Sequence, residues 1–425
     1  MVMRRRVSVR AWVILGALAL AFLGTASAHA SNTLTVCPAG PPECQFETVQ
    51  EALDAAQTGD RILIAPGTYA AGFTVAKNVS LIGSGESETT LSGGEVAVTI
   101  AADVTVEGTG LTISQGRDTG LVNRGRLTLT DSTVARNGFA SQPGPAGGIY
   151  NTGILTLLRS TIGGNITPDF GSVGGMRNDG QLTMRDSAIV NNYGETGALL
   201  NEGSAAITGT AFRSNDGMGV ANIRNGGHLE LRDGLVAEGG SDITGALDNS
   251  GVALIVDTVL RDNSGVDLTI VNRGRASLTI NRSIIRGNDS SEVGGAITNL
   301  GVLRLRGSRV TGNRAMLGGG IYNTGTAELS HTVITGNTAF ANGGGIYNTG
   351  TAELSHSVVT GNTAGESGGG IYNTGPLTLR HTLIRQNNPD DCVGCSPLLS
   401  ASPAPRGSVL QPSLAFTLRP VPAAG

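Results

Sequence analysis

The stretch Gly318-Gly-Gly-Ile-Tyr-Asn-Thr-Gly325 is the clearest copy of a repeat that indicates the fold of the chain. It returns with the same letters at residues 343–350 and 368–375, and in weaker form at least eight more times. The spacing is 25 residues. A unit of this length cannot bury an apolar face of its own, so it must stack on copies of itself. The repeat therefore predicts a solenoid.

An asparagine marks the same place in every repeat, and an apolar residue precedes it by two positions each time. The residue between them varies freely, from Tyr322 to Arg177 and Asp248. This alternation is typical of a strand whose apolar residue and asparagine point inward while the middle residue points out. We expect the buried amides to stack coil on coil and satisfy one another as a structural ladder. Its members are Asn123, Asn151, Asn178, Asn201, Asn225, Asn249, Asn272, Asn299, Asn323, Asn348 and Asn373.

Further columns follow the asparagine in each repeat. Apolar columns begin at Leu129 and Val134, and the Ser or Thr column between them is interrupted only by Gly234. A second asparagine follows the first by 14 residues in nine of the eleven repeats. Segments of period two that are this short and β-rich do not suit a helical solenoid. The prediction is an all-β fold, a parallel β-helix of about a dozen coils over residues 60–388.

The segment before the repeats has two predicted parts. Residues 1–30 are predicted to be a signal peptide, because arginines precede an apolar run over residues 11–24 and small residues offer cleavage sites. An uncleaved anchor is the alternative. Residues 31–59 are predicted to cap the first coil with a helix over residues 46–59, which the capping box of Thr48 and Glu51 begins and Gly59 ends.

Four cysteines lie in two local pairs, Cys37 with Cys44 and Cys392 with Cys395. In an exported protein these are predicted to be two disulfides. Pairing between the ends is not expected, because stacked coils rise about 4.8 Å each and would hold them apart. Metal binding or redox exchange at the second pair is the alternative, although no second such pair completes a zinc site.

Composition limits the partners. Glycine supplies 65 of 425 residues and only 15% are charged, which suits many short strands joined by tight turns. The formal net charge is −4, and cleavage after residue 30 would remove arginines but no acids. Such an acidic surface argues against nucleic acid or an anionic membrane as partner. We expect a secreted or cell-surface protein with no membrane span in the mature chain.

Two resemblances to known families follow from these motifs. The pattern Gly-Gly-x-Ile…Asn, with a second asparagine about 14 residues later, resembles the repeats of polymorphic outer membrane proteins. Residues 46–69 look like the opening of pectin-lyase-like secreted proteins, in which a short helix caps the first coil. The resemblance implies a single-stranded, right-handed parallel β-helix. It does not extend to residues 389–425, a predicted C-terminal cap and tail rich in Pro, Ser and Ala, where a membrane barrel would have no room.

The resemblance to polysaccharide enzymes implies site motifs, and the sequence lacks them. Neither the calcium-binding Asp clusters of pectate lyases nor the signatures of polygalacturonases and pectinesterases occur. One outward column nevertheless offers candidate metal ligands, since Asp233 and Asp257 fall on adjacent coils and could share a calcium ion. Two solvated carboxylates at a turn are the alternative. His331, His356 and His381 share this column and could bind metal or sense pH, or they are copies carried by near-identical repeats.

Aromatic residues supply the candidate binding sites. Tyr322, Tyr347 and Tyr372 are predicted to form an outward ladder, which could receive sugar rings or a partner's side chains, or could only stiffen the sheet. Longer loops at residues 138–147 and 166–175 would form one protrusion, and loops on a rigid scaffold are common binding sites. These loops carry Phe139, Asp169 and Phe170.

Three classes of function remain. The first is an exported, non-catalytic scaffold that presents a surface for adhesion or for glycan or protein binding. The second is a polysaccharide lyase or hydrolase of the pectin-lyase-like type. The third is a structural or ice-facing array, for which the column of Thr311, Thr335 and Thr360 is short. No cofactor is expected apart from calcium as a candidate.

Overall fold

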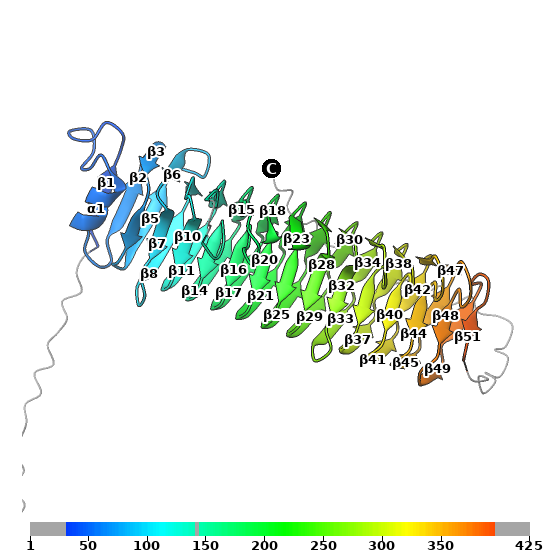
Figure 1. The fold of residues 1–425 in the computed structure, drawn as a ribbon. Helices are drawn as coiled ribbons and strands as arrows, with labels where there is room; N and C mark the ends of the chain where they lie inside the picture. Colours follow the sequence, from blue (N-terminus) through cyan, green and yellow to red (C-terminus); the bar gives the residue numbers. More distant parts are fainter. Residues whose placement is uncertain (1–30, 141–143, 396–425) are drawn as a thin grey trace, which may run out of the picture. The chain divides into compact units, whose positions relative to one another are not determined.

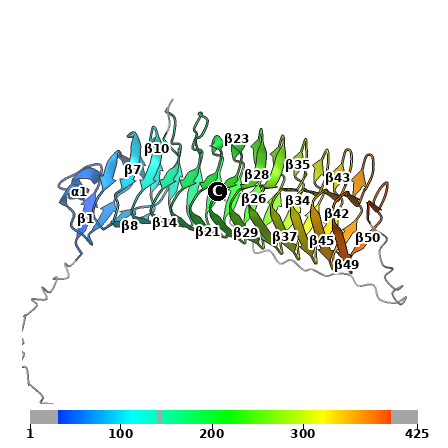
Figure 2. The ribbon, with the colours of Figure 1, turned by 60° about the horizontal axis from the view of Figure 1, so that its bottom comes forward.

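A computed structural model describes residues 31–140 and 144–395, which form one stack of β-strand coils (Figure 1). The strand pairings from coil to coil are parallel and build three sheets, here called A, B and C (Figure 2). This is the all-β, right-handed parallel β-helix that the repeat predicted. The predicted signal peptide and the tail from residue 396 onward lie outside the described residues.

The strands divide among the sheets as follows. Sheet A contains, in order, β1 (Thr33–Val36), β2 (Arg61–Ile64), β5 (Val79–Gly83), β8 (Thr105–Thr109), β11 (Arg126–Thr130), β14 (Ile154–Leu158), β17 (Gln181–Arg185), β21 (Ser204–Thr208), β25 (His228–Arg232), β29 (Val252–Val256), β33 (Ser277–Asn281), β37 (Val302–Arg306), β41 (Thr326–Ser330), β45 (Thr351–Ser355) and β49 (Leu377–Arg380). Sheet B contains β3 (Gly67–Ala70), β6 (Thr89–Ser92), β9 (Thr112–Ser114), β12 (Thr133–Ala135), β15 (Thr161–Gly163), β18 (Ala188–Val190), β22 (Ala211–Arg213), β26 (Leu235–Ala237), β30 (Val259–Arg261), β34 (Ile284–Arg286), β38 (Arg309–Thr311), β42 (Val333–Thr335), β46 (Val358–Thr360) and β50 (Leu383–Arg385).

Sheet C has two adjoining rows. The main row contains β4 (Phe73–Val75), β7 (Val96–Ile100), β10 (Thr119–Asn123), β13 (Ile149–Asn151), β16 (Met176–Asn178), β20 (Leu199–Asn201), β24 (Ile223–Asn225), β28 (Thr244–Asn249), β32 (Leu268–Asn272), β36 (Ile297–Asn299), β40 (Ile321–Asn323), β44 (Ile346–Asn348), β48 (Ile371–Asn373) and β51 (Cys392–Val393). The edge row contains β19 (Tyr193–Thr196), β23 (Asp216–Val220), β27 (Gly240–Ser241), β31 (Ser264–Gly265), β35 (Asp289–Ser290), β39 (Arg314–Ala315), β43 (Thr338–Ala339) and β47 (Thr363–Ala364).

The solenoid has about 15 coils, because sheet A contains 15 strands. The prediction of about a dozen was too low, since it counted from the asparagine repeats. In the coils before Asn123 the same inward column is occupied by Ile100 and, one coil earlier, by Val75. These coils use an apolar residue where later coils use an amide, so no repeated letter marks them.

The first asparagine column forms the predicted ladder. Each Nδ2 donates to the Oδ1 of the asparagine in the next coil, at 2.6 to 2.9 Å, from Asn123 to Asn373. The side chains are buried. The ladder starts at Asn123 with an Oδ1 that lacks a partner, because its neighbour in the preceding coil is Ile100.

The second asparagine column is also continuous, although the sequence shows a gap in it. Where the fourteen-residue spacing places Gly239, the amide of Asn222 from the preceding coil fills the space. Asn215 Nδ2 donates to Asn222 Oδ1 at 3.1 Å, and Asn222 Nδ2 donates to Asn263 Oδ1 at 3.1 Å. In the other exceptional repeat, Asn288 continues the column two residues late.

A left-handed residue makes the turn between sheets A and B in every coil from Asp131 onward. These residues have φ near +50°, a conformation that Gly, Asp, Asn and His adopt more readily than other side chains do. The predicted outward column containing Asp233, Asp257 and the three histidines is this turn column. The residue types in this column are therefore explained first by the left-handed backbone conformation. The members with positive φ are Asp131, Arg159, Asp186, Gly209, Asp233, Asp257, Arg282, Gly307, His331, His356 and His381.

The repeated Gly-Gly-Gly stretch allows close approach between coils. The first glycine has positive φ, as at Gly343 (+75°), where an added Cβ would lie 2.8 Å from Tyr347 Cβ. The third glycine faces the next coil, since a Cβ on Gly320 would lie 2.5 Å from the Gly345 carbonyl oxygen. The motif recurs because a side chain at the first place would clash within its own coil, and a side chain at the third place would push the coils apart.

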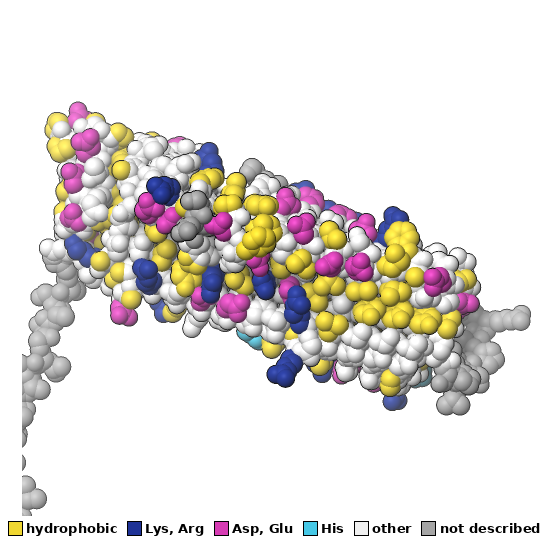
Figure 3. All heavy atoms as spheres, viewed as in Figure 1, with side chains coloured by type: hydrophobic (Ala, Val, Ile, Leu, Met, Phe, Trp, Pro, Cys, Tyr) yellow, Lys and Arg dark blue, Asp and Glu magenta, His cyan; other side chains and the backbone are white. Residues whose placement is uncertain are grey.

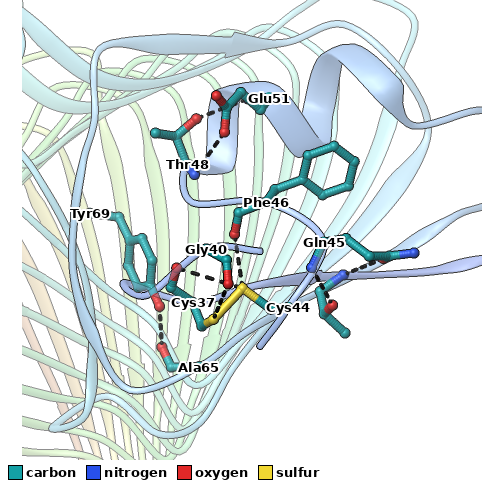
Figure 4. The surroundings of a disulfide bond; sticks show 10 residues. Cys37, Gly40, Cys44, Gln45, Phe46, Thr48, Glu51, Ala65 and Tyr69 are labelled. Carbon is teal, nitrogen blue, oxygen red and sulfur yellow. Dashed lines mark hydrogen bonds between the residues drawn. A yellow bond between two sulfur atoms is a disulfide. The ribbon is translucent and has the colours of Figure 1, made fainter. Parts of the chain in front are cut away.

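The N-terminal end is closed by helix α1 (Val49–Ala55), which is shorter than the predicted 46–59. The capping box is confirmed: Glu51 N donates to Thr48 Oγ1 at 3.2 Å, and Thr48 N donates to Glu51 Oε2 at 3.1 Å (Figure 4). Beside it lies the Cys37–Cys44 disulfide, with 6.0 Å between the Cα atoms.

The region 31–59 also contributes structure to the first coil, because β1 pairs with β2 there. At the other end, β51 pairs with β48 and contains Cys392, which forms the second disulfide with Cys395. Both cysteine pairs are therefore disulfides, as predicted.

Candidate functional site

The tyrosine ladder lies on the outer face of sheet C, on β40, β44 and β48. Tyr322 and Tyr347 stack with ring centroids 5.2 Å apart, and Tyr347 and Tyr372 with centroids 5.1 Å apart. The planes differ by only 10° and 13°, and all three side chains are half-buried. Burial raises the pKa of Tyr347 above its ordinary value near 10, and the adjacent phenols Tyr322 and Tyr372 raise it further. Figure 3 shows hydrophobic side chains gathered over these three strands.

The same outward column is closed to solvent over much of its length. At Tyr150 the phenol donates to Asp179 Oδ2 at 3.0 Å, and the Arg177 guanidinium lies 5.8 Å from the ring centroid. Asp248 is buried and held by two hydrogen bonds from Arg273, at 2.6 and 2.7 Å. Aromatic rings open to a ligand therefore stack only in the last three full coils of the described chain. The other buried members are Val122, Leu200, Val271 and Thr298.

Phe340 adds a further exposed ring on the edge row of sheet C, directly after β43. It is 49% exposed, and the Arg314 guanidinium lies 4.3 Å from its centroid. This cation–π contact holds one arginine over an open aromatic ring. The sequence analysis did not single out Phe340, because its repeat partners at this position are not aromatic.

The two predicted loops project from neighbouring coils (Figure 2). They are stacked where they begin, since Ile166 N donates to the Asn137 carbonyl oxygen at 3.0 Å. Phe139 is 49% exposed and Phe170 is 84% exposed. Asp169 is half-buried, and its backbone oxygen accepts a hydrogen bond from the Ser172 hydroxyl. A role for these residues in binding stays a prediction.

The two candidate calcium ligands lie in the turn column between sheets A and B. The Asp257 carboxylate is already engaged by Arg282, with hydrogen bonds of 2.8 and 2.6 Å. Calcium needs six to eight oxygen ligands. Within residues 31–140 and 144–395 no group of three or more His, Cys, Asp or Glu side chains is placed to hold a metal ion. A calcium ion shared by Asp233 and Asp257 stays a prediction. Such an ion would compete with Arg282 for the Asp257 carboxylate.

The histidines also stack. His331 and His356 have ring centroids 5.1 Å apart, and His356 and His381 have centroids 5.0 Å apart. Since all three occupy left-handed turn positions, the fold explains their presence without a metal. On sheet B the threonine column of the predicted array pairs in register on three strands, and its members are Thr311, Thr335 and Thr360.

A depression that the sequence analysis missed lies on the edge row of sheet C. It has a volume of about 340 Å³. Its lining includes Tyr193, Asp216, Met218, Gly240 and Asp242. The sequence signal for this depression is the column formed by the residue directly after the second-asparagine position. On three successive coils this residue is Tyr193, Asp216 and Gly240. Here a missing side chain opens the surface.

No helix in the described part of the chain is long and apolar enough to cross a membrane. The Chlamydia polymorphic membrane protein (Chlamydia_PMP) repeat matches residues 356–374. No curated protein matches the chain.

Several solved structures are similar to the chain over most of its length. The PL6 family alginate lyase AlyGC is 12% identical, with a TM-score of 0.36, over 82% of this chain and 76% of that one. A mutant of the periplasmic alginate epimerase AlgG is 12% identical, with a TM-score of 0.40, over 76% and 77%. Pectin methylesterase from carrot is 11% identical, with a TM-score of 0.27, over 81% and 87%. Likeness at this level carries no argument about activity. The chain is a parallel β-helix with polymorphic-membrane-protein-like repeats, and its neighbours have the pectin- and alginate-lyase type of fold.

Proposed function

We propose that the protein is an exported scaffold that binds a glycan or a protein segment along the tyrosine ladder and performs no chemistry on it. The observation that supports the proposal is the stack of Tyr322, Tyr347 and Tyr372, half-buried on a rigid sheet. Aromatic faces offer large contact area at little conformational cost, and their phenol groups can hydrogen-bond. Export is supported by the two disulfides and by the match to a membrane protein repeat.

The rigidity of the ladder favours binding. The rings follow the coil spacing, so they are held in place before a ligand arrives, and little side-chain entropy is lost on binding. Beneath them, Ile321, Ile346 and Ile371 are almost fully buried and fix the register of the three strands. The ligand would be an extended chain running along the axis of the solenoid.

The test compares two triple variants in the same three coils. Replacement of Tyr322, Tyr347 and Tyr372 by alanine should lower affinity for a bound glycan or protein at least tenfold, at about 0.5–1.5 kcal/mol for each ring. The matched control replaces His331, His356 and His381 by glutamine, on a different side of the coils, and should bind as the wild type does. Thermal unfolding of both variants checks that the coils persist.

The same experiment addresses the polysaccharide lyase or hydrolase alternative. Mature protein is incubated with polyuronates and neutral glycans, with and without calcium, while new reducing ends and unsaturated products are followed alongside pull-down binding. Binding without products supports the scaffold. Product formation contradicts it, and equal binding by the tyrosine variant and the wild type removes the ladder from the proposal.

A further inference from the structure

The depression on the edge row of sheet C is separate from the tyrosine ladder and lies several coils nearer the N-terminus. Tyr193 pairs in register with Asp216, and Asp216 pairs with Gly240, so the three positions follow one another on successive coils. Parallel neighbours are about 4.8 Å apart. A ring and a carboxylate therefore stand side by side, and the next position along the axis has no side chain.

Gly240 keeps the Asp216 carboxylate accessible. A Cβ on Gly240 would lie 3.1 Å from Asp216 Oδ1, so any larger residue would crowd the carboxylate. The backbone of Gly240 is not in the left-handed region. Backbone geometry therefore does not require glycine here, and the open space is a property of the surface.

The carboxylates of this depression are not neutralised by the protein. Asp216 and Asp242 are exposed, and neither forms an ion pair within the described ranges 31–140 and 144–395. Their neighbour Glu195 differs, because Arg224 lies 3.3 Å from its Oε1 and Gly171 N donates to its Oε2. The depression therefore offers two uncompensated negative charges next to a tyrosine that is 40% exposed.

We propose that this depression binds an amino sugar, with the pyranose face on Tyr193 and the ammonium group between Asp216 and Asp242. The volume of about 340 Å³ lies at the small end of ligand pockets, so it takes one or two sugar rings. An aromatic face receives the apolar face of the ring, and carboxylates accept hydrogen bonds from ammonium and hydroxyl groups. The inference rests on the proposed binding function, and the negative charge of the depression disfavours polyuronates as ligands.

The test measures binding of a β-1,4-linked glucosamine tetramer by calorimetry at low salt. The N-acetylated tetramer, tetragalacturonate and the polyamine spermine serve as comparison ligands. We expect the amino tetramer to bind most tightly and to weaken as salt is added. Asp216→Asn should lower its affinity about two- to fivefold, as for an exposed ion pair. Tyr193→Ala should lower it about two- to tenfold.

The control is Asp267→Asn, an exposed carboxylate one coil beyond the depression, which should leave affinity unchanged. No binding of the amino tetramer, or equal binding of the acetylated tetramer or spermine, overturns the inference. Affinity that falls in the tyrosine-ladder variant but not in Tyr193→Ala or Asp216→Asn also overturns it, and leaves the proposed function standing. Because Asp216→Asn preserves shape at an exposed site, it should fold as the wild type does.

Discussion

The asparagine ladder predicts that the same substitution has different costs at different coils. In the interior of the ladder, Asn323 accepts a hydrogen bond from Asn299 at 2.7 Å and donates to Asn348 at 2.6 Å. It also donates to the carbonyl oxygens of Gly325 at 3.3 Å and Thr351 at 3.1 Å. The two Nδ2 hydrogens share the three donated contacts, so about three hydrogen bonds are lost in all, and at about 1 kcal/mol for each bond Asn323→Leu should cost about 3 kcal/mol.

At the first rung the same change should cost much less. The Asn123 Oδ1 has no partner, and the preceding coil presents Ile100 in the same column. Asn123→Leu therefore extends the apolar column by one coil and transfers the unpaired acceptor to Asn151, so the number of such acceptors stays the same. The two Nδ2 hydrogens lose the three contacts that they share, but the new side chain packs on Ile100, and we expect a net cost of about 1–2 kcal/mol.

The assay should report on single coils, because the coils of a solenoid can open separately. Native-state hydrogen exchange of the amides around residues 123 and 323 gives the local free energy of opening in the wild type and both variants. Chemical denaturation followed by circular dichroism gives a global comparison. Equal losses at the two positions, or a loss below about 1 kcal/mol at Asn323, would refute the account of the ladder as a set of buried, mutually satisfied amides.

Two further substitutions test the glycines, and one tests an ion pair. Gly343→Ala should lower stability by about 2 kcal/mol or more, because φ is +75° and the new Cβ would meet Tyr347. The same contact should disturb the tyrosine ladder. The melting temperature measures the first effect and tyrosine fluorescence the second. Gly312→Asn should change stability by less than about 0.5 kcal/mol, since its φ of +64° suits asparagine and no atom lies within 4 Å of the added Cβ. The Arg213 guanidinium lowers the pKa of Glu238 below 4.5, so this carboxylate stabilises the fold above its unfolded pKa and loses that contribution as pH falls through its lowered folded pKa. Unfolding titrations should therefore show Glu238→Gln slightly less stable than wild type at neutral pH and equal to it in acid; a gap that persists in acid would contradict this.

Repetition explains why most of the fold could be predicted from the sequence. A column is recognisable when one residue type recurs at a fixed interval, as with Asn323, Asn348 and Asn373. The early coils escaped this reasoning because Val75 and Ile100 occupy the column without a distinctive letter.

The turn column between sheets A and B was recognised as outward but not as left-handed. A mixture of Asp, Gly and His at one position is a backbone signature, since these residues tolerate positive φ. The backbone alone therefore accounts for this composition, and a calcium or histidine site in the column stays a prediction. The ion pair of Asp257 could have been predicted, because Arg282 lies one repeat of 25 residues further on, in the same column of the next coil.

The candidate sites differ in how far the sequence could predict them. The tyrosine ladder repeats, so its stacking follows from the period alone. The depression beside Tyr193 does not repeat, because it depends on one glycine, Gly240, at a place where neighbouring coils have side chains. To predict such a site, one must know which residues face each other on successive coils. Insertions of two or three residues change this register along the chain.

The inner columns also explain how such a scaffold can carry different surfaces. Ile321, Ile346 and Ile371, with the asparagines two positions later, fix the register of each coil from inside. Where the outward residue between them is exposed, its substitution usually changes stability by less than about 0.5 kcal/mol. The tyrosine position is Thr298 one coil before the ladder and Asp248 two coils earlier still, without a change of fold. Binding specificity can therefore differ from coil to coil while the interior stays constant. We accordingly expect function to depend on the outward residues that differ between coils.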